Sequence, residues 1–263
     1  MLVVSKDRLE ASVCRDEFYS FVRRFWETII PEKPVWNWHI EYLCGELQKV
    51  VERVIRREPK AYDLAINISP GSTKSTLCSV MLPAWVWTND QTIRSICGSY
   101  AFPLALYLAS QTIRICQSEK YLKFFPEVEL VKTAESLVMT SKGGQRLATS
   151  VGGSVTGMHG HLLIIDDPLN PREAVSKAML DTANEWMSQT LPTRKIDKLV
   201  TPLILIMQRL HQSDPTAELM KKREGDALRH VCLPAEVSDR VRPRRLRKMY
   251  VDGLMDPVRL NKK

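Results

Sequence analysis

The first part of the chain carries apolar side chains at the three- and four-residue spacing of amphipathic helices. One such face runs from Phe18 to Ile29, after Arg15-Asp16, and a second helix begins near Asn37. From Ala61 onward, short apolar runs alternate with helical segments. This alternation is typical of a parallel sheet that is covered by helices.

The pattern after Ala61 predicts a definite order of elements. They are a strand at Leu64–Ile68, a helix at Lys74–Trp87 that Pro83 kinks or ends, a strand at Ser95–Gly98, a helix at Leu104–Gln117, a hairpin of Leu137–Thr140 and Arg146–Thr149, a strand at Leu162–Ile165, a helix at Glu173–Leu191, a strand at Pro202–Met207 and a helix that starts at Ser213-Asp214-Pro215.

Composition places the chain among globular proteins. It has 263 residues, 44% of them hydrophobic, which favours one large α/β domain. We expect neither a signal peptide nor a membrane span, which needs ~20 apolar residues. Six cysteines without a Cys-x-x-Cys pair indicate reduced thiols, and the net charge of +8 is compatible with a polyanionic partner.

Small and hydroxyl-bearing residues surround a lysine directly after the first predicted strand, in the segment Ser69-Pro70-Gly71-Ser72-Thr73-Lys74-Ser75-Thr76. Backbone N–H groups at a helix start attract anions, a lysine adds charge for the β- and γ-phosphates, and an adjacent hydroxyl can bind Mg²⁺. The usual phosphate-binding pattern has glycine at the places of Thr73 and Ile68. An ordinary capped helix start therefore stays open as the alternative.

Two carboxylates, Asp166 and Asp167, end the fully apolar run Leu162–Ile165. Such a run belongs in the middle of a parallel sheet, and ligands bind at the carboxyl ends of its strands. One acid there can hold the Mg²⁺ of a nucleotide, and a second can orient the attacking water. A plain strand-ending turn is the alternative. The lysine segment and the paired acids together favour a nucleotide hydrolase.

The predicted strand Ser95–Gly98 lies along the chain between these two motifs. An added strand of this kind is the layout of the ATPase branch that includes helicases, translocases and ring ATPases, the ASCE class. We therefore predict an α/β fold: a P-loop NTPase of the ASCE type, with a mostly parallel central sheet flanked by helices and an N-terminal helical segment.

Short motifs occur in order across most of Ala61–Arg259. They are Pro70–Thr76, Leu82–Trp85, Gly98–Tyr100, Gly152–Gly157, Ile164–Pro168, Gln208–Asp214, Leu233–Glu236 and Asp252–Arg259. In order and spacing they resemble the large terminase subunit of tailed bacteriophages. Proteins of that family package viral DNA: an N-terminal ATPase pumps duplex DNA into a preformed capsid, and a C-terminal nuclease cuts it.

The resemblance implies roles for the residues of the two motifs. Pro70–Thr76 would bind ATP, with Gly71 supplying the tight backbone, Lys74 on the β- and γ-phosphates and Ser75 on Mg²⁺. Asp166 would position the Mg²⁺ through water. Asp167 stands where most relatives have the catalytic glutamate, and Glu173 is a possible helper, although an acid that interacts with a helix dipole explains it equally well.

The resemblance also assigns residues outside these motifs. Gln208 and Arg209 occupy the place of a motif that senses the γ-phosphate and transmits hydrolysis to movement; a strand-end ion pair is the alternative for Arg209, and an N-cap is the simpler role for Asp214. His39 lies where relatives can contact the nucleotide base, with a polar helix residue as the alternative.

An arginine finger is missing from its usual place, because Thr156 precedes Gly157. Such a finger contributes roughly 10³–10⁵-fold in rate in related systems. Arg146, on the predicted hairpin, is the candidate substitute, and an ordinary surface arginine is the alternative.

We expect three parts: an N-terminal helical segment at 1–60, an ATPase domain at 61–236 and a basic linker at 237–263 toward a nuclease domain. The run Arg240–Lys248 would contact DNA phosphates or form a solvated, flexible face. The implied partners are double-stranded DNA, the portal protein, the small terminase subunit and further copies in a ring on the portal, in the host cytoplasm and without a membrane.

Three other functions stay open. A helicase-like ATPase would separate strands. A DNA-binding scaffold would keep DNA affinity without turnover. A nuclease that uses Asp166 and Asp167 as metal ligands would cut DNA with Mg²⁺ or Mn²⁺ in the absence of ATP.

Overall fold

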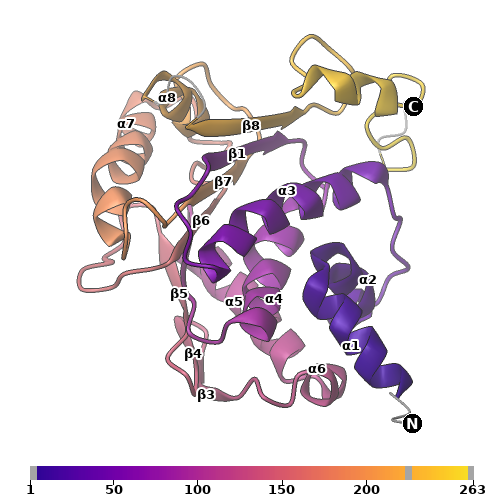
Figure 1. Ribbon diagram of the computed structural model, residues 1–263. Helices are drawn as coiled ribbons and strands as arrows, with labels where there is room; N and C mark the ends of the chain where they lie inside the picture. Colours follow the sequence, from indigo (N-terminus) through magenta and orange to yellow (C-terminus); the bar gives the residue numbers. More distant parts are fainter. Residues whose placement is uncertain (1–4, 223–226, 260–263) are drawn as a thin grey trace.

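An eight-stranded sheet runs through the centre of the computed structural model, which describes residues 5–222 and 227–259 (Figure 1). The strand order is β3 (Leu130–Ala134), β4 (Leu137–Thr140), β5 (Gln145–Ser150), β2 (Arg94–Ser99), β6 (Leu162–Asp166), β7 (Leu203–Met207), β1 (Asp63–Ile68), β8 (Leu228–Leu233). Neighbouring strands pair in parallel along the part β5-β2-β6-β7-β1-β8, and β4 pairs antiparallel with β3 and β5. The predicted α/β fold with a mostly parallel central sheet is confirmed.

The order of the strands decides which loops meet. Strand β2 follows β1 along the chain, but in the sheet it lies on the outer side of β6. The strand that separates β1 from β6 is β7, with Ile204 opposite both Leu64 and Ile164. Because these strands are parallel, the segments that follow β1, β7 and β6 emerge side by side at one edge.

Helices cover both faces of the sheet. They are α1 (Lys6–Asp16), α2 (Phe18–Ile29), α3 (Trp38–Ile55), the π-helix η1 (Thr76–Met81), α4 (Leu82–Asn89), α5 (Phe102–Cys116), α6 (Glu119–Phe124), α7 (Lys177–Glu185), the π-helix η2 (Trp186–Thr190), the 3₁₀-helix η3 (Leu191–Arg194), α8 (Pro215–Lys222) and the 3₁₀-helix η4 (Arg244–Met249). Helices α7 and α8 lie on the face opposite to α3, α4 and α5 (Figure 1).

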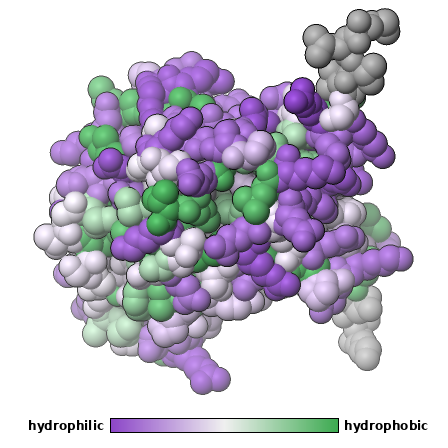
Figure 2. All heavy atoms as spheres, turned by 90° about the horizontal axis from the view of Figure 1, so that it is seen from below, coloured by the Kyte–Doolittle hydropathy of each residue, from purple (hydrophilic) through white to green (hydrophobic). Residues whose placement is uncertain are grey.

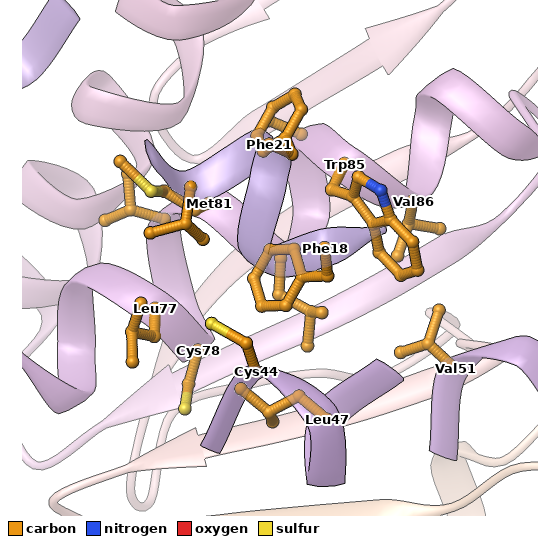
Figure 3. Close-up of a cluster of buried hydrophobic side chains, with 14 of the residues drawn as sticks. Phe18, Phe21, Cys44, Leu47, Val51, Leu77, Cys78, Met81, Trp85 and Val86 are labelled. Carbon is orange, nitrogen blue, oxygen red and sulfur yellow. The ribbon is translucent and has the colours of Figure 1, made fainter. Parts of the chain in front are cut away.

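The larger core joins the N-terminal helices to the sheet. Side chains of α2 and α3 pack against η1 and α4 in one continuous cluster (Figure 3). The rings of Phe18 and Trp85, for example, lie 5.1 Å apart. A smaller cluster on the other face holds Trp186 and Leu191 against β6 and β7. Both strands are therefore buried on both faces, as their continuous apolar sequences predict.

The helix after the lysine segment continues through Pro83 and ends at Asn89. The predicted end at Trp87 is therefore two residues early, and the helix does not end at Pro83. Proline is tolerated because it sits at the start of α4, just after a π-helical stretch. The predicted helix at Glu173–Leu191 begins later, at Lys177. The remaining predicted strands and the hairpin are present.

The segment after β8 packs onto the domain. Arg242 bridges back to Cys232, and Val241 and Leu246 are buried. The Tyr250 ring lies 5.8 Å from that of Trp38 on α3. The expected linker at 237–263 is thus packed as far as residue 259, with residues 260–263 outside the described part, and its Arg240, Arg244 and Arg245 side chains are exposed.

The surface mixes hydrophilic and apolar side chains on the face seen in Figure 2. Helices long and apolar enough to cross a membrane are not found in the part of the chain that the structure describes.

Candidate functional site

The loop between β1 and η1 has an unusual backbone. Gly71 has a φ of 73° and Thr73 a φ of 63°, both in the left-handed region. The Ser72 hydroxyl donates a 2.6 Å hydrogen bond to the Ser69 carbonyl across the turn. A loop in which left-handed residues alternate with right-handed ones can turn its N–H groups toward one concave side, which is a site for anions. Thr73 stands where phosphate-binding loops have glycine, and its positive φ shows why glycine suits that position.

The lysine of this loop meets the paired carboxylates. Lys74 is buried, and its Nζ lies 2.7 Å from Oδ2 of Asp167. Asp167 follows β6 with a φ of 44°, so the chain turns sharply there and aims the carboxylate toward the loop. The two motifs, distant in sequence, therefore form one site at the carboxyl edge of the sheet.

Asp166 lies deeper, with 2% of its surface exposed. Its Oδ2 accepts a 3.0 Å hydrogen bond from the Ser79 hydroxyl. Burial and the neighbouring Asp167 carboxylate raise the pKa of Asp166 to about 6, and a hydrogen bond from Ser75 and the charge of Lys74 oppose this shift. The charged form of this carboxylate is therefore costly, and a cation beside it would reduce that cost.

The oxygens at this edge fit a divalent cation of the magnesium type. Oδ1 of Asp166 and Oδ1 of Asp167 are buried without a hydrogen-bond partner, and the Ser75 hydroxyl is adjacent to Asp166. Mg²⁺ prefers one or two carboxylates together with waters and phosphate oxygens. Within residues 5–222 and 227–259, no group of three or more His, Cys, Asp or Glu side chains is placed to hold a metal ion.

Arg146 does not lie where an arginine finger must lie. It is fully buried on β5, and its Nη2 donates a 2.9 Å hydrogen bond to the Ser79 carbonyl. A guanidinium in the core cannot enter a neighbouring subunit, so the expected role is wrong for this residue. Pro83 has no N–H to donate to the π-helical stretch before it, and Arg146 supplies a donor to the Ser79 carbonyl of that stretch.

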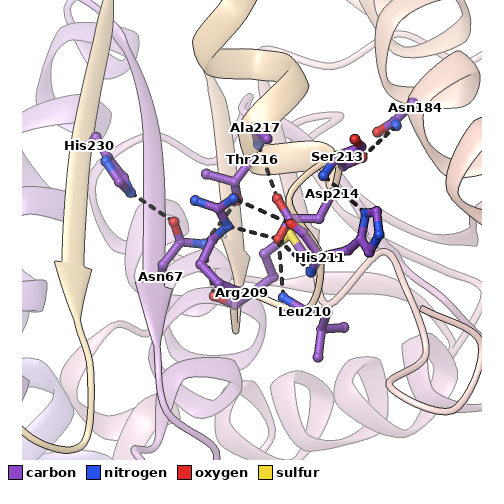
Figure 4. A network of polar contacts seen from close by, with 11 residues as sticks. Asn67, Asn184, Arg209, Leu210, His211, Ser213, Asp214, Thr216, Ala217 and His230 are labelled. Atoms are coloured by element: carbon purple, nitrogen blue, oxygen red, sulfur yellow. Dashed lines mark hydrogen bonds and ion pairs between the residues drawn. The ribbon is translucent and has the colours of Figure 1, made fainter. Parts of the chain in front are cut away.

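The segment after β7 forms a polar network (Figure 4). Nε of Arg209 lies 2.8 Å from Oδ2 of the fully buried Asp214. Asp214 also accepts from the backbone N–H groups of Leu210, at 3.1 Å, and Ala217, at 3.0 Å, so it caps α8. The N-cap and the strand-end ion pair, which sequence left as alternatives, are both present. The coupling role of Arg209 and the half-buried Gln208 stays a prediction.

Asn67 ties this network to the strand that precedes the loop. Its Nδ2 donates to the Met207 carbonyl at 3.1 Å and to the Thr216 hydroxyl at 2.9 Å, and its Oδ1 lies 2.8 Å from Nε2 of His230 (Figure 4). The ends of β1, β7 and β8 are therefore held together beside the site.

His39 is fully buried near the start of α3, so the expected contact with a nucleotide base is wrong in this conformation. Burial lowers the pKa of His39, against the effects of Asp256 and of the Ser72 backbone. The ring thus packs beneath the loop. Glu173 and Thr156 are exposed, and the role suggested for Glu173 stays a prediction.

Three residues at the site were not found from the sequence: Ser79, Asp256 and Arg259. Ser79 could have been found, because its hydroxyl lies on the buried, otherwise apolar face of the helix that follows the lysine. Arg259 donates from Nη1 to the Gly71 carbonyl at 3.3 Å. Asp256 and Arg259 lie in the motif Asp252–Arg259, but that motif gave no sign of a place at the site, because the contact of Arg259 with the loop joins parts of the chain that are far apart in sequence.

A comparison with protein-family models gives no match, and neither does a comparison with curated proteins. Among solved structures, the large terminase of the HK97 bacteriophage is similar, with a TM-score of 0.50 and 16% sequence identity. The similarity covers 86% of this chain and 44% of that one, so the chain spans less than half of its length. The chain therefore has a fold similar to that of a phage large terminase.

Proposed function

We propose that this chain is an ATP hydrolase that drives the movement of double-stranded DNA, as the motor of phage DNA packaging does. The observation that carries the proposal is the meeting of Lys74 with Asp167 at the carboxyl edge of a parallel sheet, beside Asp166 and a left-handed loop. A nucleotide triphosphate is the ligand whose charge, oxygens and metal ion match this set of groups.

The residues of the site would act in a definite order. The N–H groups of the loop and the Lys74 ammonium would bind the β- and γ-phosphates, so Lys74 would leave its ion pair with Asp167. Asp167, thus released, would orient a water molecule in line with the γ-phosphate. A bound Mg²⁺, held by Ser75 and Asp166, would neutralise phosphate charge. The Arg209 segment, next to the loop, would transmit loss of the γ-phosphate.

The fold similarity to a phage large terminase favours a packaging motor over other ATPases. The proposed partners are double-stranded DNA, the portal protein, the small terminase subunit and further copies in a ring, in the host cytoplasm. A neighbouring copy would supply the arginine finger that Arg146 cannot provide.

The test is phosphate release from ATP with Mg²⁺, with and without duplex DNA, for the wild type, Lys74→Ala and Asp167→Ala. Lys177→Ala is the matched control, because Lys177 is exposed on α7. We expect both site variants to lose turnover, Lys74→Ala to lose ATP binding as well, and the control to keep both.

Other outcomes point to the other functions. A wild type that neither binds nor hydrolyses ATP would refute the proposal, and DNA affinity would then favour a scaffold. Strand separation driven by ATP would indicate a helicase. Cutting of DNA by Mg²⁺ or Mn²⁺ without ATP, lost in Asp166→Ala, would indicate a nuclease.

A further inference from the structure

The C-terminal segment returns to the loop that follows β1. Nη1 of Arg259 donates a 3.3 Å hydrogen bond to the Gly71 carbonyl. Oδ1 of Asp256 accepts from the Arg259 backbone N–H at 3.2 Å, and its Oδ2 lies 3.7 Å from Nε of Arg259. The carboxylate therefore holds the arginine by backbone and side chain together and directs it at the loop.

The residue before Asp256 is fixed by the N-terminal part of the chain. Met255 is buried, and its carbonyl accepts from Nδ2 of Asn37 at 2.9 Å and from Nε1 of Trp38 at 3.2 Å. Its backbone N–H donates to the Ala235 carbonyl at 2.9 Å. Arg259 therefore projects from an anchored turn rather than from a free tail.

A second buried group, His39, lies near the same loop without a hydrogen bond to it. His39 is fully buried and lies near both the Ser72 backbone and Asp256. Asp256 is itself only 2% exposed. Burial of a carboxylate is costly unless a positive group lies beside it, and the Arg259 guanidinium is that group for Asp256.

The contact between Arg259 and the Gly71 carbonyl restrains the orientation of a whole peptide group in the loop. A peptide unit is planar and trans, so its C=O and N–H point in opposite directions. Arg259 holds the Gly71 carbonyl, and the N–H of Ser72, in the same peptide, is therefore held pointing away from Arg259. Glycine is the most mobile residue of such a loop, so this peptide has the most to gain from a restraint.

We propose that Asp256 and Arg259 form a brace that holds the phosphate-binding loop in its binding conformation, with Arg259 as a positioning residue for the nucleotide. The inference has two parts. The positioning of a nucleotide by Arg259 rests on the proposed function. The restraint of Gly71 by Arg259 does not depend on that function. Residues 251–259 would then respond to nucleotide binding.

Hydrogen exchange of the peptide that contains Gly71–Thr73 tests the brace directly. We would compare the wild type with Arg259→Ala, Arg259→Lys and Arg245→Ala, which removes an exposed arginine of the same segment. Exchange in the loop should become several-fold faster in Arg259→Ala, only partly so in Arg259→Lys, and stay unchanged in Arg245→Ala. Equal exchange in Arg259→Ala and the wild type would overturn the brace.

Nucleotide affinity tests the positioning role of Arg259. Loss of one charge-assisted bond of this kind should weaken ATP binding by about 2- to 10-fold, with no effect in Arg245→Ala. ATP should also slow exchange in residues 251–259 of the wild type but not of Lys74→Ala. Faster loop exchange with unchanged ATP affinity would overturn the positioning role alone. A wild type that binds no ATP would refute the proposed function, while the exchange comparison still decides the brace.

Discussion

Replacing Thr73 with glycine should give a more stable protein than replacing it with alanine, which is the reverse of the usual order. Thr73 has a φ of 63°, in the region where a β-carbon crowds the following carbonyl. Both substitutions remove the same methyl and hydroxyl groups, including the hydrogen bond from the hydroxyl to the Ser72 carbonyl. The two variants therefore differ only in the β-carbon, and their comparison isolates the strain.

The magnitude follows from two opposing effects. A non-glycine residue in the left-handed conformation costs roughly 1–2 kcal/mol. Glycine loses about 0.4–1 kcal/mol through the greater freedom of the unfolded chain. The glycine variant should therefore exceed the alanine variant by about 1 kcal/mol in free energy of unfolding, or about 2 °C in melting temperature for a chain of this size.

Urea unfolding followed by circular dichroism measures this difference. The matched control is Gly45→Ala in α3, where a new β-carbon meets nothing within 4 Å and the backbone is helical. There alanine should be the more stable residue by about 0.5–1 kcal/mol. An alanine variant at Thr73 that equals or exceeds the glycine variant would refute the argument that this loop imposes a left-handed residue.

Two further predictions concern stability. Gly144→Ala should lower the free energy of unfolding by about 1–3 kcal/mol, because its β-carbon would lie 2.2 Å from the Gln91 carbonyl oxygen, a backbone atom that cannot rotate away; a urea midpoint equal to that of the wild type would contradict this. Burial, with the charges of Arg57 and Arg94, lowers the pKa of His161 to about 4 from its ordinary value of 6.5. The unfolded chain therefore binds more protons between these pH values, so stability should fall as pH drops from 6.5 to 4, and less steeply in His161→Gln. Urea midpoints across that range measure the slope, and equal slopes would exclude His161 as the source.

The parts of the fold that sequence predicts are those whose pattern is set locally. Strands β6 and β7 are continuous apolar runs because they are buried on both faces, and the residues that end them meet because parallel strands end at one edge. That reasoning alone brings Lys74 and Asp167 together. The place of β2 in the sheet, on the outer side of β6, could not be predicted, since the order of strands depends on packing between elements that are distant along the chain.

The parts that sequence does not predict depend on partners far away. Strand β8 contains Arg229, which breaks the apolar run but pairs with Glu46 of α3 at 2.9 Å. His39 and Arg146 look like polar surface or site residues, yet both are fully buried. Their burial depends on the Asp256 turn and on the Ser79 carbonyl, and neither contact leaves a trace in the neighbouring sequence.

The pairing of Pro83 with Arg146 has a consequence for how this sequence can change. Pro83 has no N–H to donate to the stretch of helix before it, and Arg146 donates to the Ser79 carbonyl of that stretch. Another residue at position 83 would bring an N–H to this stretch and would lessen the need for a donor at position 146. Loss of the arginine alone would leave a buried carbonyl unpaired. A change at position 83 should therefore cost less when it comes before a change at position 146, and the two positions should vary together among descendants of this chain.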